Sequence, residues 1–188
     1  MAKSGYHHGD LRATILAAAA DQIATDGVDS VSLRELARRA GVSHAAPAHH
    51  FGDRAGVLTA LAVEGYELLA AALTAAGPDF REVAVAYIQF AREHPGHFDV
   101  MFRHTLLRAD DPRLHAARLA SAAALRSGVT AIRPGDLAQQ QATQLAAWSL
   151  VHGFAALWRE GALDNSSLAA GADPETLARR MLATVRFD

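Results

Sequence analysis

Hydrophobic residues recur along most of this chain at the three- and four-residue spacing that places them on one face of an α-helix. The first such segment carries Leu11, Ile15, Ala18, Ala19 and Ile23, and it ends at Asp26-Gly27. No segment shows a convincing alternation of apolar and polar residues, the pattern of a half-buried strand. The pattern therefore predicts an all-α protein with about nine helices.

Capping residues and helix breakers separate the later helices from one another. Asp53 can cap a long helix that stops at Gly77-Pro78, and His94-Pro95-Gly96 ends the amphipathic helix after it. Arg133-Pro134-Gly135 is expected to break the chain before a long late helix. The remaining predicted segments are 98–103, 114–129, roughly 137–160 and a last helix from Asp173-Pro174-Glu175.

Two short helices joined by a tight turn are predicted between Ser32 and Phe51. Ser32-Leu33-Arg34-Glu35 has the pattern of a capping box, in which the Ser32 hydroxyl accepts a backbone N–H and Glu35 reaches back. Gly41-Val42 forms the turn, and Ser43 can cap the second helix. Such a pair after a longer helix is typical of a helix-turn-helix unit, whose second helix enters the major groove of DNA.

Over roughly its first 58 residues the chain resembles the DNA-binding domain of the TetR repressors. The matching residues are Gly27, Ser32, Leu33, Leu36-Ala37, Ala40-Gly41-Val42-Ser43, His50-Phe51, Arg54 and Val57-Leu58. His94-Pro95-Gly96-His97-Phe98 with Val100-Met101-Phe102, and Trp148 with His152-Gly153, resemble the WHG-type C-terminal domain of part of that family. The resemblance implies a DNA-binding three-helix bundle over residues 1–56 and a helical ligand-binding and dimerisation domain over 57–188.

The resemblance also assigns roles within the helix-turn-helix. It implies that Ser32 and Arg54 contact phosphates and that Phe51 pins the recognition helix to the first helix. His44, Ala45, Ala46 and His49 would face the bases. The full implied DNA-binding set is Ser32, Ser43, His44, Ala45, Ala46, His49, His50 and Arg54. The chain departs from the family at Ala48, where tyrosine is usual, and Pro47 removes an early bond of the recognition helix.

The charge of the chain changes this picture. The 188 residues carry 18 Lys/Arg and 20 Asp/Glu, and residues 1–58 hold six of each, so that segment has no net charge. We therefore expect few phosphate contacts, weak sequence-independent binding and a shallow salt dependence. Histidines in this segment can add charge when protonated near phosphate: His7, His8, His44, His49 and His50.

The long late helix shows two faces that need partners. A wide apolar arc surrounds Trp148, and small residues form a second strip, so we expect a core on one side and another subunit on the other. The resemblance implies a four-helix bundle between two subunits. The implied interface residues are Ser149, Gly153, Ala156, Leu177 and Met181. A buried core helix is the alternative.

The aromatic and methionine residues on the other helices are each more often core residues than the wall of a ligand site. As a lining they would suit a mostly hydrophobic effector with one or two polar anchors. The resemblance implies a cavity among these helices. The candidate ligand-binding residues are Tyr87, Phe98, Met101, Phe102, Trp148 and His152. His152 is the best polar candidate, and the alternative is a buried histidine that is satisfied within the core.

Other chemistry finds little support. The chain has no cysteine, His44 and His49 are five residues apart, and His94 and His97 straddle a Pro-Gly pair, so we predict no metal and no cofactor. No nucleophile or phosphate-loop motif is present, so we predict no enzyme. Residues 1–10 lack an apolar run and no later stretch is long and uncharged enough to span a bilayer, so we expect a cytoplasmic, nucleoid-associated protein.

These patterns and the resemblance to the TetR repressors together predict a homodimeric, ligand-responsive transcriptional regulator. It would act as a repressor that binds palindromic double-stranded operator DNA and changes its affinity when a small effector binds. The alternative is a helical small-molecule-binding protein with weak or lost DNA binding. A third possibility is an all-α enzyme that uses His152 or the His94 and His97 pair.

Overall fold

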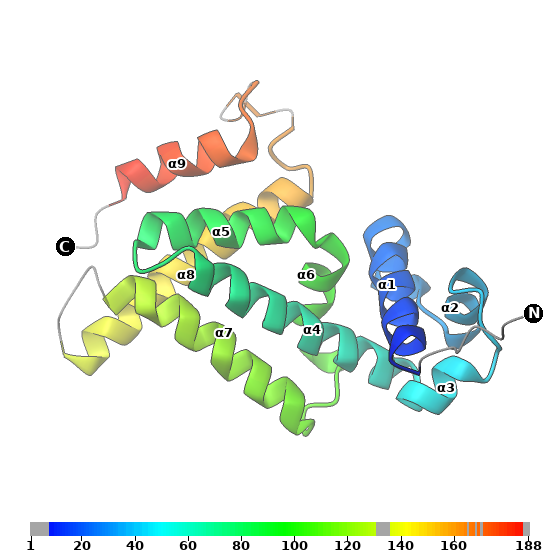
Figure 1. Cartoon of the computed structure of the whole chain (residues 1–188). Coiled ribbons are helices and arrows are strands. Elements are labelled where there is room, and N and C mark those ends of the chain that lie inside the picture. The colour runs from blue at the N-terminus through cyan, green and yellow to red at the C-terminus, as the bar shows by residue number, and fades with distance from the viewer. Residues whose placement is uncertain (1–7, 131–135, 165, 168, 170, 186–188) are drawn as a thin grey trace, which may run out of the picture. The chain divides into compact units, whose positions relative to one another are not determined.

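The computed structural model describes residues 8–130, 136–164, 166–167, 169 and 171–185. This part of the chain forms nine α-helices and two short 3₁₀ helices without a strand, which confirms the all-α prediction (Figure 1). The expected break at Arg133-Pro134-Gly135 lies outside the described residues. The helices are α1 His8–Asp26, η1 Val28–Ser30, α2 Leu33–Arg39, α3 Ala46–Phe51, α4 Arg54–Ala75, α5 Phe80–Glu93, α6 Pro95–Met101, η2 His104–Leu106, α7 Pro112–Thr130, α8 Leu137–Arg159 and α9 Pro174–Thr184.

The described chain folds into two compact units. Unit 1 contains residues 8–65 and 94–116, and unit 2 contains 66–93 and the described residues from 117 onward. This division by packing differs from the functional boundary predicted after residue 56. Helix α4 is continuous through residue 56, and the segment after α5 packs with the N-terminal helices.

Unit 1 is built on close contact between α6 and α1. A Cβ atom at Gly96 would lie 2.1 Å from the carbonyl oxygen of Ala20, so a larger residue cannot enter without moving the backbone. A Cβ atom at Gly65 of α4 would lie 2.7 Å from the sulfur of Met101, which is fully buried. Two glycines therefore let α6 lie against both α1 and α4.

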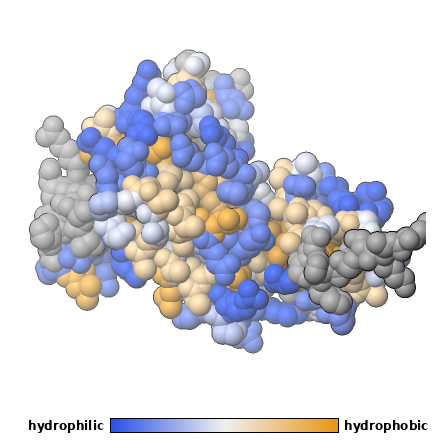
Figure 2. All heavy atoms as spheres, viewed as in Figure 1, coloured by the Kyte–Doolittle hydropathy of each residue, from blue (hydrophilic) through white to orange (hydrophobic). Residues whose placement is uncertain are grey.

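In unit 2, α5 packs against both α8 and α9 (Figure 1). Ile88, Phe154 and Ala178 form a buried cluster, one residue from each of the three helices. Arg179 of α9 donates to Glu82 of α5 at 2.7 Å on the exposed side of this contact. Figure 2 shows that apolar surface patches remain over the helices of unit 2.

Local sequence signals set several helix ends as predicted. Asp53 caps α4 by accepting the backbone N–H of Gly56 at 2.8 Å, and Asp173 caps α9 by accepting that of Thr176 at 3.0 Å. Pro95 differs from its predicted role, because it begins α6 as well as ending α5. Proline fits the first turn of a helix, where its missing N–H has no intrahelical acceptor.

Helix α4 corrects one expectation. By length and composition it is long and apolar enough to cross a membrane, although we expected no such segment. Yet 61% of its most apolar 18-residue window is buried inside the protein. Burial of this kind is typical of a core helix, whose apolar surface is covered by neighbouring helices.

Candidate nucleic-acid interface

Helix α2 begins with half of the predicted capping box. The Ser32 hydroxyl accepts the backbone N–H of Glu35 at 3.3 Å. The Glu35 carboxylate does not complete the box and instead accepts hydrogen bonds from Arg38 at 2.6 Å and Arg39 at 2.9 Å. These two guanidinium groups lower the pKa of Glu35 to about 2. Two of the few cations in this segment are thus paired within α2, which reduces the positive charge available to DNA.

The recognition helix α3 begins later than predicted. Gly41 turns the chain with a φ of +65°, residues 44–45 form a further turn, and the helix starts only at Ala46. The Ala46 N–H is bonded to the Ser43 carbonyl oxygen at 3.0 Å, so the Ser43 hydroxyl is not the predicted cap. Pro47 lies in the first turn, as predicted.

The residues predicted to meet DNA divide by exposure. Ser43, His44, Ala45 and His49 are exposed, and His50 is half-buried. Ala46 is only 8% exposed, which corrects its prediction as a base-facing residue. Because the helix starts at Ala46, this position turns toward the core. The exposed imidazole of His44 lies just before α3, and that of His49 lies at the end of its first turn.

Phe51 anchors the recognition helix. Its ring is 6% exposed, and the Arg12 guanidinium of α1 lies 5.2 Å from the ring centroid. This cation–π contact joins α3 to α1 in addition to the burial of the ring. The predicted core role of Phe51 agrees with this position.

Arg54 has a role that its sequence position did not reveal. Its Nε donates to the carbonyl oxygen of Val31 at 3.0 Å, and its Nη2 donates to that of Val28 at 2.8 Å. The start of α4 is thereby tied to the segment between α1 and α2. Since these bonds direct the guanidinium into the protein, the structure supports a positioning role for Arg54 rather than the expected phosphate contact.

Two consecutive hydrogen bonds within unit 2 join three predicted ligand-binding residues. Trp148 Nε1 donates to the Tyr87 hydroxyl at 3.3 Å, and that hydroxyl lies 2.9 Å from Nδ1 of His152. If His152 Nδ1 is the acceptor, the Tyr87 hydroxyl both accepts and donates. Burial raises the pKa of Tyr87 and lowers that of His152, so both groups favour their neutral forms.

The other predicted ligand-binding residues lie elsewhere. Phe98 and Met101 are buried in α6 of unit 1, and the Phe102 ring lies 5.3 Å from that of Phe98. The predicted set is therefore divided between the two units, because α6 packs with α1. The sequence could not show this, since all these aromatic residues lie on apolar helix faces.

Helix α8 presents apolar side chains on its outer surface. Leu145 is 60% and Leu157 46% exposed, and Ser149 between them is also exposed. Gly153 and Ala156 are half-buried in the same stretch. Leu177 and Met181 of α9 instead pack against the Ile88 cluster of their own chain.

The described histidines and acids form no group of three that could hold a metal ion. The His94 and His97 rings meet edge to face with centroids 5.7 Å apart. His97 Nε2 lies 3.9 Å from a carboxylate oxygen of Glu64, which lowers the pKa of Glu64.

We expect Arg54→Gln to destabilise the protein, because it removes two charge-assisted hydrogen bonds to backbone carbonyls. The free energy of unfolding should fall by about 1.5–3 kcal/mol, measured by urea denaturation. Arg34→Gln, which removes an exposed arginine of α2, is the matched control. Equal stability of the two variants would show that the Arg54 bonds contribute nothing.

The lowered pKa of His152 predicts a pH-dependent stability. As the pH falls through 6.5, the unfolded chain takes up a proton that the folded chain resists, so the melting temperature decreases. The melting temperature stops decreasing once the pH is below the pKa of His152 in the folded protein. His152→Gln should reduce this dependence between pH 7 and 5.5, whereas exposed His115→Gln should leave it unchanged. If the melting temperatures of wild type and His152→Gln decreased equally between pH 7 and 5.5, the prediction would be contradicted.

Two family models match the chain. The model of bacterial regulatory proteins of the TetR family covers residues 15–61, and that of the tetracycline repressor-like C-terminal domain covers 80–185. A comparison with curated protein sequences gives no match.

Solved structures with the same fold also match the chain. A protein of unknown function from Rhodococcus sp. RHA1 is 36% identical with a TM-score of 0.77, over 97% of this chain and 96% of that chain. The TetR family transcriptional regulator PfmR from Thermus thermophilus is 22% identical with a TM-score of 0.65, over 89% and 90%. A TetR-family transcriptional regulator from Bordetella parapertussis 12822 is 19% identical with a TM-score of 0.65, over 92% of each chain. The last two share the fold, and with the two domain models they lead to one conclusion: this chain belongs to the TetR family of DNA-binding transcriptional regulators.

Proposed function

We propose that this regulator is a homodimeric repressor that binds a palindromic operator and releases it when a small, mostly hydrophobic effector binds. The observation that carries the proposal is the exposed surface formed by His44, Ala45 and His49 at the start of α3. The surface spans the turn before α3 and the first turn of α3, and the buried Phe51 ring anchors that helix to α1.

The exposed groups of the turn before α3 and of α3 itself suit the major groove. Imidazole nitrogens of His44 and His49 can hydrogen-bond to base edges, and the Ala45 methyl group suits the methyl group of thymine. The exposed Ser32 at the start of α2 would contact a phosphate. The recognition surface therefore supplies more base contacts than phosphate contacts.

The apolar stripe of α8 supports the dimer. Leu145 and Leu157 each leave much of their surface exposed in a single chain, and small residues between them allow a second helix to approach. A two-fold dimer places two recognition helices on two half-sites, which multiplies the affinity of a weakly charged single unit.

The polar chain of Tyr87, His152 and Trp148 supports an effector site in unit 2. These groups would provide the polar anchors for a ligand that is otherwise apolar. Release follows from a population shift, since the effector binds one arrangement of the dimer more tightly. Moving the operator from nearly full to nearly empty requires a preference of about 5.5 kcal/mol for that arrangement.

A second candidate function is small-molecule binding with weak or lost DNA binding. Ala48 is exposed where the family usually has tyrosine, and Arg38 and Arg39 are paired with Glu35. A mobility-shift assay on promoter DNA of its own or a neighbouring gene separates the two. A retarded complex at low salt supports the repressor, and its absence supports the second candidate.

On the operator so identified, His44→Ala and His49→Ala should each weaken binding by roughly 5- to 150-fold while leaving random-sequence binding nearly unchanged. The reason is that base contacts carry sequence discrimination. Fluorescence anisotropy on the two duplexes measures this, with exposed His115→Ala as control. Equal losses on both duplexes would show that these histidines do not read bases.

Leu145→Asp combined with Leu157→Asp should halve the apparent mass in size-exclusion chromatography with light scattering. Operator affinity should fall by at least about 100-fold, because the two half-sites are then bound independently. Leu119→Asp, at an exposed leucine of α7, is the control. A double variant that remains dimeric would place the interface elsewhere.

A further inference from the structure

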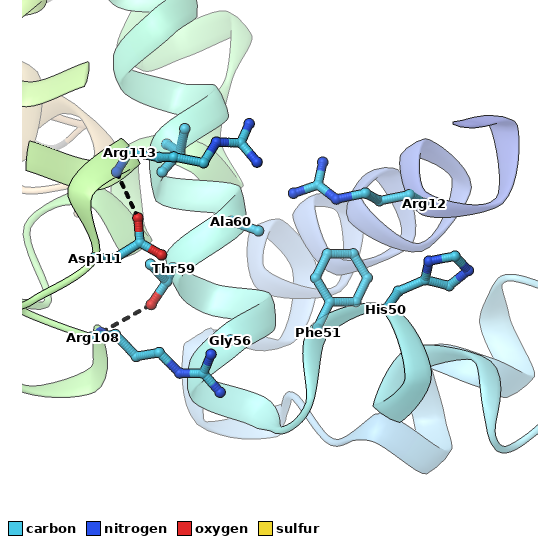
Figure 3. A pocket seen from close by; sticks show the side chains of 10 residues that line it. Arg12, His50, Phe51, Gly56, Thr59, Ala60, Arg108, Asp111 and Arg113 are labelled. Atoms are coloured by element: carbon cyan, nitrogen blue, oxygen red, sulfur yellow. Dashed lines mark hydrogen bonds between the residues drawn. The ribbon is translucent and has the colours of Figure 1, made fainter. Parts of the chain in front are cut away.

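Unit 1 contains a pocket of about 150 Å³ that no part of the proposed function uses. Its walls come from α1, α3, the first turns of α4 and the segment that leads into α7 (Figure 3). Arg12, Arg108 and Arg113 line it together with His50, and Asp111 is the acid in the lining. The pocket is thus cationic although the surrounding DNA-binding segment has no net charge.

Two of these arginines converge without an acid between them. Figure 3 shows that Arg12 and Arg113 extend their guanidinium groups toward one another across the pocket. Among the described residues, neither has a carboxylate within ion-pair distance. Arg12 contacts the ring of Phe51, and its charge acts on Glu64 from farther away, where it helps to lower the pKa of that carboxyl. Like charges that face each other repel, so this arrangement favours an anion between them.

Two acids beside the pocket, Asp111 and Asp53, are already engaged, and a third, Glu64, lies 3.9 Å from His97. The Asp111 carboxylate accepts the backbone N–H groups of Arg113 at 2.9 Å and Leu114 at 3.0 Å, which caps α7. Asp53 caps α4 and accepts from Arg108 at 3.0 Å. Each of these two carboxylates is held by its own helix end, so neither is available to bridge Arg12 and Arg113.

We propose that this pocket binds a small phosphate-like oxyanion between Arg12 and Arg113. Guanidinium groups present paired N–H donors that match the oxygens of phosphate. The volume suits a single tetrahedral ion, because pockets for drug-sized ligands occupy about 300–1,000 Å³. The inference does not depend on the effector or the dimer proposed above.

A bound oxyanion would link α1 to the start of α7. Arg12 belongs to the helix that supports the recognition helix, and Arg113 belongs to the first turn of α7. The ion would therefore hold these two parts of unit 1 together. The phosphate can come from inorganic phosphate in solution or from the backbone of a bound duplex.

The experiment measures the melting temperature of the full-length protein against sodium phosphate, with chloride balancing the ionic strength. Wild-type protein should show a saturable increase. Arg113→Gln should raise the dissociation constant for phosphate by at least about tenfold, the loss of one charge-assisted contact. Exposed Arg81→Gln removes the same charge from unit 2 and should leave the titration unchanged.

A second measurement identifies the source of the phosphate. If duplex DNA supplies it, Arg113→Gln reduces the salt slope of random-duplex binding by about one ion and phosphate competes with DNA. If the free ion is the ligand, that slope stays unchanged while the phosphate titration is still lost. A wild-type protein without a saturable phosphate response and with a salt slope equal to that of Arg113→Gln would overturn the proposal.

Discussion

The close approach of α6 to α1 is the contact on which the rest of unit 1 depends. Gly96 brings the start of α6 against the backbone of Ala20, and Gly65 leaves room for Met101. With α6 in this position, the following segment lies beside α4, where the Arg108 backbone N–H donates to the Thr59 hydroxyl at 2.9 Å. The helix-turn-helix thus shares one core with a segment that follows α5 in the sequence.

Several cations of the helix-turn-helix are engaged in contacts within unit 1. Arg12 covers Phe51, Arg54 binds two backbone carbonyls, and Glu35 engages two arginines of α2. The Arg54 bonds and the Glu35 pairs engage cations within the protein, whereas the Arg12 guanidinium still lines the pocket of unit 1. In the function proposed above, specific contacts by a few exposed side chains, used twice in a dimer, would compensate for this weak charge.

Several features could be predicted from the sequence because they depend on neighbours within one or two helical turns. The all-α pattern, the caps at Ser32, Asp53 and Asp173, and the turn at Gly41 follow from spacing and from the conformational needs of these residues. The core position of Phe51 came from the resemblance to the TetR family and agrees with its burial.

Contacts between distant residues could not be predicted in this way. Arg54 binds carbonyl oxygens 23 and 26 residues away. Phe98 and Met101 belong to unit 1, whereas Tyr87 and its hydrogen-bond partners belong to unit 2. The late start of α3, which turns Ala46 inward, depends on how the turn packs. The sequence by itself determined the helices, because periodicity and caps act locally, and its resemblance to the TetR repressors indicated the class of protein. Only the tertiary structure decided which side chains share a site, since that depends on how the helices pack.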